Sequence, residues 1–379
     1  MKTDYLPVGI TQEQLMQLIV PKLQNLFYPD AYNNLGVNGA RLDDLNIATG
    51  YASSYSHENF FYDIVLRNLD PPWPNFGGTT AVQQAAQLDP EYIFLWIGNN
   101  DILGYVLSGG EEPGRITDLT TFETELRDIL TYLQANTTNA KIVLANIPEY
   151  LPFGYALDHV FVAGSPEIFD PTTLEPIDFT GSGGYIDLQV ASEDAGTVKH
   201  LLLTAAAAYI EEGMGIDPAD LNDKQKDLLA SKGVTIPTAA VPLTKDLVFT
   251  DEEESLSLST IAAFNSIIQT VAEDYGLPVV DVNSWMKPEG GSPLPDDSCL
   301  RFALVAQDNT IFSLDGIHPS NYGHALIANE FIATMNAEFG LHIPKLNPEN
   351  YKGQYSGKAL VVPSLKAIRR LEEMYAPSR

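Results

Sequence analysis

Helical patterns alternate with short apolar runs along much of this 379-residue chain, and this alternation limits the possible folds more than any other feature. Each helical pattern carries apolar residues on one face, and each apolar run is bounded by turn residues. The expected helix and strand pairs are 79–88 with 92–97, 120–133 with 141–147, and 250–275 with 278–282. Strands that alternate with helices predict a doubly wound α/β fold with a mostly parallel, flavodoxin-like sheet covered on both faces.

Capping residues mark the expected ends of the helices. Capping boxes are expected at residues 11–14, at Thr120 with Glu123, and at Thr250 with Glu253. Ser320 is expected to begin a last helix, which ends at Gly340. The helix that begins near residue 11 is expected to pack on the sheet.

The alternation breaks between residues 148 and 249, where Gly-rich, Pro-rich and helical pieces follow one another. Helical pieces are expected at 200–213 and 217–233. We interpret this region as an inserted cap or lid; a stability element or a dimer surface is the alternative interpretation. The predicted division is therefore 1–147 and 250–345 as the two parts of the α/β domain, 148–249 as the insertion, and 346–379 as a C-terminal tail.

Charge and cysteine content narrow the classes of partner. The chain carries 21 Lys and Arg against 50 Asp and Glu, a net charge of -29, which disfavours nucleic acid and anionic membrane surfaces and makes a neutral substrate the better fit. The single cysteine, Cys299, excludes an intrachain disulfide and a cysteine-rich metal site. No apolar run is long enough to span a bilayer, and residues 1–30 lack the pattern of a secretory signal.

Three polar loops are candidates for chemistry. Asp315 precedes His318 by three residues, a spacing that lets the carboxylate orient one ring nitrogen while the other accepts a proton from a hydroxyl nucleophile. A hairpin over residues 301–314 is expected to deliver this loop. The small-residue loop 34–41 and the segment 98–101, which follows an apolar strand, could both present hydrogen-bond donors. Together these loops favour a hydrolase.

The order of the motifs resembles that of the SGNH (GDSL-type) hydrolase superfamily, in its lipase and esterase branch. The matching blocks are Asn34-Leu35-Gly36-Val37-Asn38-Gly39-Ala40, Gly98-Asn99-Asn100-Asp101 and Asp315-Gly316-Ile317-His318-Pro319. The resemblance implies His318 as general base, Asp315 as its orienting carboxylate, Gly39 as a backbone oxyanion donor and Asn100 as a side-chain oxyanion donor. It also implies a small-molecule ester or lipid substrate, a reaction that needs no cofactor, and an extracellular or periplasmic location. The oligomeric state stays open.

The nucleophile implied by the resemblance has no counterpart in the sequence. The family carries its serine in a Gly-Asp-Ser-Leu or Gly-Asn-Ser-Leu block before the Gly39 block, and neither tetrapeptide occurs here. None of the other candidate serines has the strand-turn-helix setting of such a nucleophile; they are Ser53, Ser54, Ser56, Ser165, Ser182 and Ser292. We expect either an N-terminally truncated enzyme, whose serine lies upstream of Met1, or a catalytically inactive protein that binds a lipid or glycan.

The remaining polar residues are interpreted as structural. The other histidines show no spacing typical of metal ligands, so no metal site is assigned; they are His57, His159, His200, His324 and His342. Asp101 could assist Asn100, but it is interpreted first as a cap at the start of a helix.

Overall fold

The computed structural model describes residues 28–57, 59, 61–68, 75–108, 110–149, 161–162, 165–166, 200–202, 209, 212–231, 233–244, 248–286 and 319–352. Several predictions lie outside these residues: the helix beginning near residue 11, the hairpin over 301–314, Cys299, and the loop that holds Asp315 and His318. The division of the chain into domains stays a prediction.

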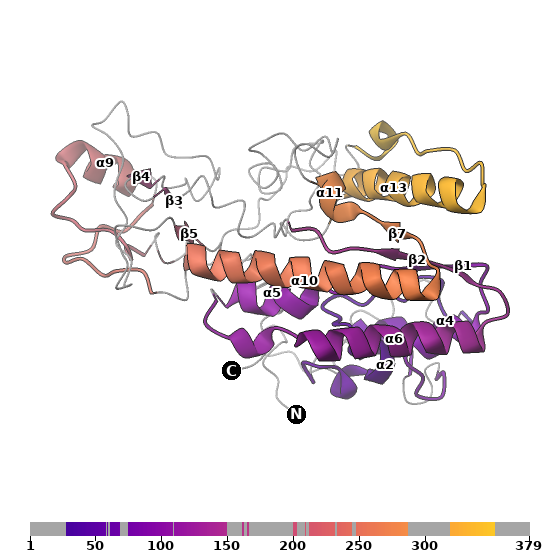
Figure 1. Ribbon diagram of the computed structural model, residues 1–379. Coiled ribbons are helices and arrows are strands. Elements are labelled where there is room, and N and C mark those ends of the chain that lie inside the picture. Colours follow the sequence, from indigo (N-terminus) through magenta and orange to yellow (C-terminus); the bar gives the residue numbers. More distant parts are fainter. Residues whose placement is uncertain are drawn as a thin grey trace.

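A three-stranded parallel sheet forms the centre of the described structure (Figure 1). Its strands are β1 (Tyr92–Leu95), β2 (Lys141–Ala145) and β7 (Val279–Val280), in the order β1-β2-β7. Tyr92 pairs with Lys141 and Leu144 pairs with Val279, both in parallel register. The expected strands therefore form, although each is shorter than its apolar run.

Helices cover both faces of the sheet, which confirms the α/β prediction (Figure 1). The helices are α4 (Ala81–Gln87), α5 (Asn100–Leu107), α6 (Leu119–Asn136), α10 (Asp251–Tyr275), α11 (Val282–Met286) and α13 (Asn321–Phe339). Alternate residues of β2 face opposite ways: Ile142 and Leu144 join the core with α4, α5, α6 and α10, whereas Val143 and Ala145 join the core with α11 and α13.

Several of the helix caps predicted from the sequence are present in the structure. Thr80 begins α4 with a capping box to Gln83, and Ser320 accepts a hydrogen bond from the N–H of Gly323 at the start of α13. The box expected at Thr120 is wrong. Asp118 caps α6 instead, by accepting from Thr121 N, because the helix begins one residue before Thr120.

Helix α10 is long and apolar enough, by length and composition alone, to pass the test for a membrane span over residues 252–275. Core helices of soluble proteins pass the same test. Here Ile261, Phe264 and Ile268 are buried against the sheet side of the molecule, and the ring of Phe264 stacks on that of Phe122 in α6 at 4.1 Å between centroids. Part of the apolar face of α10 is thus used in packing within the chain, whereas Leu256 and Leu258 are exposed.

Two expectations for the region 148–249 are wrong. Residues 200–202 are not helical: they form β5 (His200–Leu202), which pairs antiparallel with β6 (Val248–Thr250). The expected helix over 217–233 is shorter, because α9 (Asp223–Ser231) begins only after Asn222, whose side chain accepts from Gln225 N. A second antiparallel pair joins β3 (Phe161–Val162) to β4 (Ser165–Pro166).

The smaller elements complete the described fold. They are α2 (Asp44–Ile47), η2 (Tyr51–Ser53), α3 (Phe61–Leu66), η3 (Pro113–Arg115) and η7 (Pro348–Tyr351). Strand β1 is one of the two edge strands of the sheet among the described residues, and Phe94 on it is 53% exposed although the strand is apolar throughout. Phe94 packs edge-on against Phe331 of α13.

Candidate functional site

The Gly39 loop turns tightly just before α2. Gly39 has a φ of +77°, and the N–H of Ala40 bonds to the carbonyl of Val37 at 3.2 Å. Such a φ favours glycine, since a side chain here is strained. The amide of Asn59 donates to the carbonyl of Asn38 at 2.7 Å and holds the loop from its other side.

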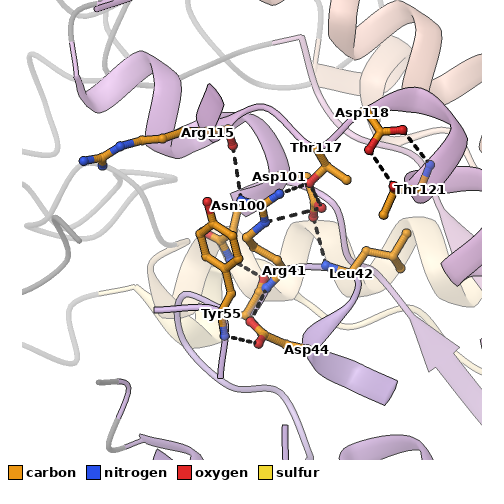
Figure 2. Close-up of polar contacts among 11 residues, drawn as sticks. Arg41, Leu42, Asp44, Tyr55, Asn100, Asp101, Arg115, Thr117, Asp118 and Thr121 are labelled. Atoms are coloured by element: carbon orange, nitrogen blue, oxygen red, sulfur yellow. Dashed lines mark hydrogen bonds and ion pairs between the residues drawn. The ribbon is translucent and has the colours of Figure 1, made fainter. Parts of the chain in front are cut away.

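Asn100 begins α5 where the chain leaves β1. Gly98 makes the sharp turn between the strand and the helix, with a φ of +110°. The side-chain amide of Asn100 donates to the carbonyl of Ala40 at 2.8 Å. The structure therefore joins Asn100 to the residue that follows Gly39, so the segments of two of the four predicted site residues meet although they lie sixty residues apart in the sequence. Figure 2 shows Asn100 next to Arg41 of the Gly39 loop.

This arrangement suits the binding of a negatively charged oxygen. A primary amide has two N–H donors, so the bond to Ala40 fixes the orientation of Asn100 and leaves its second N–H for a ligand. Among the described residues no acceptor is found for the N–H of Gly39. One backbone and one side-chain donor beside each other form an oxyanion hole in acyl-transfer enzymes.

A buried carboxylate lies behind these donors. Asp101, which is fully buried, accepts from the backbone N–H of Leu42 at 3.0 Å and from the hydroxyl of Thr117 at 2.5 Å. Burial raises the pKa of this carboxyl to about 6, against the lowering effects of Thr117, Arg41 and Leu42. The backbone N–H of Thr117 also bonds to the carbonyl of Asp101 at 3.0 Å.

The guanidinium of Arg41 completes this buried network (Figure 2). It lies 3.7 Å from the centre of the Tyr55 ring, donates to the carbonyl of Arg115 at 3.3 Å and bonds to the hydroxyl of Thr117. Its Nε is 3.8 Å from the carboxylate of Asp101. A buried cation and a buried carboxylate so close together lower the cost of removing both from water.

Asp44 connects the segment that holds Tyr55 to the loop that holds Arg41. Its carboxylate accepts from the N–H of Arg41 at 3.0 Å and from the N–H of Tyr55 at 2.6 Å. Burial nevertheless raises the pKa of Asp44 above its ordinary value. The Tyr55 ring is thereby placed over the guanidinium of Arg41.

A second group of amides lies at the ends of β2 and β7. Asn265 of α10 makes two bonds with the backbone of Ile147: its amide donates to the carbonyl at 2.7 Å and its oxygen accepts from the N–H at 2.8 Å. Asn283 donates to the same carbonyl at 2.8 Å, and Asn146 donates to Asp281 at 2.7 Å. These bonds fix the chain where it leaves β2 towards the region 148–249.

The other predicted residues are placed as follows. Asp315 and His318 lie outside the described residues, so their roles stay predictions. The hydroxyl of Ser53 donates to the carbonyl of Gly50 and that of Ser54 donates to the carbonyl of Tyr51, so both act within a local turn. Within the described ranges, no group of three or more His, Cys, Asp or Glu side chains could hold a metal ion.

Sequence reasoning assigned the wrong role to Asp101. The residue at the N-cap of α5 is Asn99, and the carboxylate of Asp101 points into the core of the network instead of capping the helix. The sequence offers no local signal for this placement, because the carboxylate's partners, Leu42 and Thr117, lie far from it along the chain.

Comparison with known proteins agrees with these features. No significant match is found among curated proteins or solved structures. The family model described as GDSL-like Lipase/Acylhydrolase matches residues 9–331, which is most of the chain and includes the Gly39 and Asn100 segments as well as Asp315 and His318. The chain therefore belongs to the GDSL-like lipase/acylhydrolase family, a family of SGNH-type hydrolases.

Proposed function

We propose that this protein acts on carboxylic esters, with the Gly39 N–H and the Asn100 side-chain amide stabilising the oxyanion of the tetrahedral intermediate. The observation that carries the proposal is the bond from Asn100 to the carbonyl of Ala40, which holds a side-chain donor against the residue that follows Gly39. The family match supports a hydrolase in general, and the ester is the finer inference. The net charge of -29 favours a neutral ester over an anionic one.

His318 is the proposed general base, and Asp315 is the residue that orients it. The base takes a proton from the hydroxyl that attacks the acyl carbon and later gives it to the leaving alkoxide. A serine hydroxyl is the proposed nucleophile, and its identity is part of the test. In an enzyme that keeps a base and an oxyanion hole, water can also be the attacking group, at a much lower rate.

The first test asks whether the donors bind an oxyanion, and it requires no turnover. Butyrate is titrated into the ¹⁵N-labelled protein, since a product carboxylate places one oxygen where the oxyanion forms. We expect saturable shifts of the Gly39 backbone amide and the Asn100 side-chain amide, which Asn100→Ala abolishes. Asn136→Ala is the matched control, because Asn136 also donates to one backbone carbonyl, at 2.8 Å, but lies exposed at the end of α6.

The second test measures chemistry and searches for the nucleophile. Hydrolysis of p-nitrophenyl butyrate is followed for the wild type, Asn100→Ala, His318→Ala and Asn136→Ala. Loss of one oxyanion donor is expected to reduce turnover roughly 10²-fold or more, as in other acyl-transfer enzymes. A fluorophosphonate probe followed by peptide mapping identifies the serine.

Turnover that survives both Asn100→Ala and His318→Ala contradicts the proposed roles. Saturable butyrate binding with no turnover and no labelled serine instead supports the inactive protein that binds a lipid or glycan.

A further inference from the structure

Asp101 has no role in the chemistry described above, yet it is the most completely buried charged group of the site. Its two carboxylate oxygens are used by different segments: one accepts from the backbone of Leu42 and the other from the side chain of Thr117. Figure 2 shows the carboxylate between the Gly39 loop, the start of α5 and the chain that leads into α6. Burying a carboxylate costs free energy of folding. Capping of α5 does not explain why Asp101 is buried here, because Asn99 occupies the N-cap position.

The two proposed oxyanion donors lie on the same two segments that Asp101 joins. Asn100 and Asp101 are neighbours in α5, and Ala40 and Leu42 lie in the same turn after Gly39. Two hydrogen bonds connect these segments, from Asn100 to Ala40 at 2.8 Å and from Leu42 to Asp101 at 3.0 Å. One bond leaves the segments free to rotate about it, whereas two bonds at adjacent positions fix both their separation and their relative orientation.

Thr117 and Arg41 keep the carboxylate in place. Thr117 contacts Asp101 through both its hydroxyl and its backbone N–H, and Arg41 joins Thr117 to the Gly39 loop. The carboxylate therefore has little freedom to follow a shift of the loop.

We propose that Asp101 is the positioning residue of this site: it ties the Gly39 loop to α5 and so sets the distance between the Gly39 N–H and the Asn100 amide. The inference rests on the proposed function. The spacing of the two donors decides whether both can reach one oxygen, and a misplacement of about 1 Å in such sites can reduce the rate on the order of 10²-fold. Asp101 acts through Leu42 and Asn100 and does not touch the substrate.

The test compares Asp101→Asn with Asp118→Ala. Asparagine keeps the size of the side chain but can accept from only one of the two donors without rearrangement. Asp118→Ala removes the cap of α6, seventeen residues along the chain from Asp101 and without a bond to the Gly39 loop. Two properties are measured: the ¹⁵N–¹H resonances of Leu42 and of the Asn100 side chain, and the kcat and KM for p-nitrophenyl butyrate.

We expect Asp101→Asn to shift both resonances and to lower kcat roughly 10-fold or more, with KM nearly unchanged, because the oxyanion forms only on the way to the intermediate. Asp118→Ala is expected to leave both resonances in place and kcat within about twofold. Thr117→Val is the second variant, for use where Asp101→Asn does not fold. It removes the hydroxyl that donates to Asp101 and accepts from Arg41, keeps the backbone bond from Thr117 to Asp101, and should lower kcat by about 3-fold to 10-fold.

A folded Asp101→Asn protein with wild-type resonances and wild-type kcat overturns the inference, as does an equal fall in kcat for Asp118→Ala. Failure of the proposed function looks different. In that case Asn100→Ala leaves turnover unchanged, whereas failure of the present inference leaves Asn100→Ala impaired and Asp101→Asn fully active.

Discussion

Gly98→Ala is expected to destabilise the protein more than a substitution at any of the open glycine turns. An alanine Cβ at this position lies 2.6 Å from Cδ1 of Ile147 and 3.1 Å from Cζ of Phe122, and both of these side chains are buried. The φ of +110° adds backbone strain of roughly 1–2 kcal/mol for a residue with a side chain. Forcing a methyl group into a filled core adds about 1–3 kcal/mol.

The expected loss is therefore roughly 2–5 kcal/mol, a large part of the ~5–15 kcal/mol that stabilises a typical folded protein. Gly276→Ala is the matched control, because Gly276 has a φ of +65° and no atom within 4 Å of the added Cβ. That variant should lose only the backbone part, roughly 1–2 kcal/mol. The difference between the two variants then measures the clash together with the greater backbone strain at a φ of +110° than at +65°.

The assay is urea unfolding of Gly98→Ala, Ile147→Val and the double variant. Ile147→Val removes the Cδ1 atom that the new methyl group meets, and by itself it should cost about 0.5–1.5 kcal/mol. We expect the double variant to lose about 1 kcal/mol less unfolding free energy than the two single variants lose together, because the shortened side chain makes room for the methyl group. Two results refute the claim that Gly98 is required because a side chain would clash with Ile147: strictly additive losses in the double variant, or a Gly98→Ala protein that is no less stable than Gly276→Ala.

Three further predictions follow from named contacts. Burial raises the pKa of Asp101 in the folded protein to about 6, from roughly 3.9 in the unfolded chain. The unfolded chain therefore loses this proton first, and the free energy of unfolding should fall by up to about 3 kcal/mol as pH rises from about 4 to about 6. Urea unfolding at several pH values should show the difference between wild type and Asp101→Asn changing across this window, and a constant difference contradicts the pKa shift. Asn265→Ala removes both bonds to the backbone of Ile147 and should lower the unfolding free energy by about 1–3 kcal/mol, measured against the exposed control Asn136→Ala; equal losses contradict the role given to Asn265. Phe264→Ala should cost about 3–5 kcal/mol by emptying the space stacked on Phe122, and a loss below 1 kcal/mol in thermal or urea unfolding contradicts the packing described.

The regular elements could be predicted because local signals and tertiary packing agree in them. In α6, the residues expected to face inward are all buried: Phe122, Leu126, Ile129, Leu130 and Leu133. Ser320 and Gly340 mark the ends of α13 as expected, since capping depends on a few neighbouring residues. The cap of α6 was misassigned because Asp118 and Thr120 both satisfy the local rule, and only the backbone of the folded chain decides between them.

The meeting of the Gly39 and Asn100 segments could be predicted from the sequence, but the contacts that support it could not. Gly39 and Asn100 belong to motifs with a fixed spacing, and the bond from Asn100 to Ala40 agrees with the predicted convergence of their loops. The partners of Asp101 come from Leu42 and Thr117, fifty-nine and sixteen residues away, and no local pattern records such a contact. The strand β5 was missed for the same reason, because its pairing partner β6 lies far along the chain.

The central claim is that the Gly39 N–H, the Asn100 amide and the His318 ring surround one acyl carbon. A crystal structure of the protein with bound butyrate tests this claim most directly. The account predicts one carboxylate oxygen at about 2.7–3.1 Å from both Gly39 N and Asn100 Nδ2, with the His318 ring facing the carboxyl carbon. A carboxylate bound elsewhere, or a His318 ring on the opposite side of the molecule from Asn100, contradicts it.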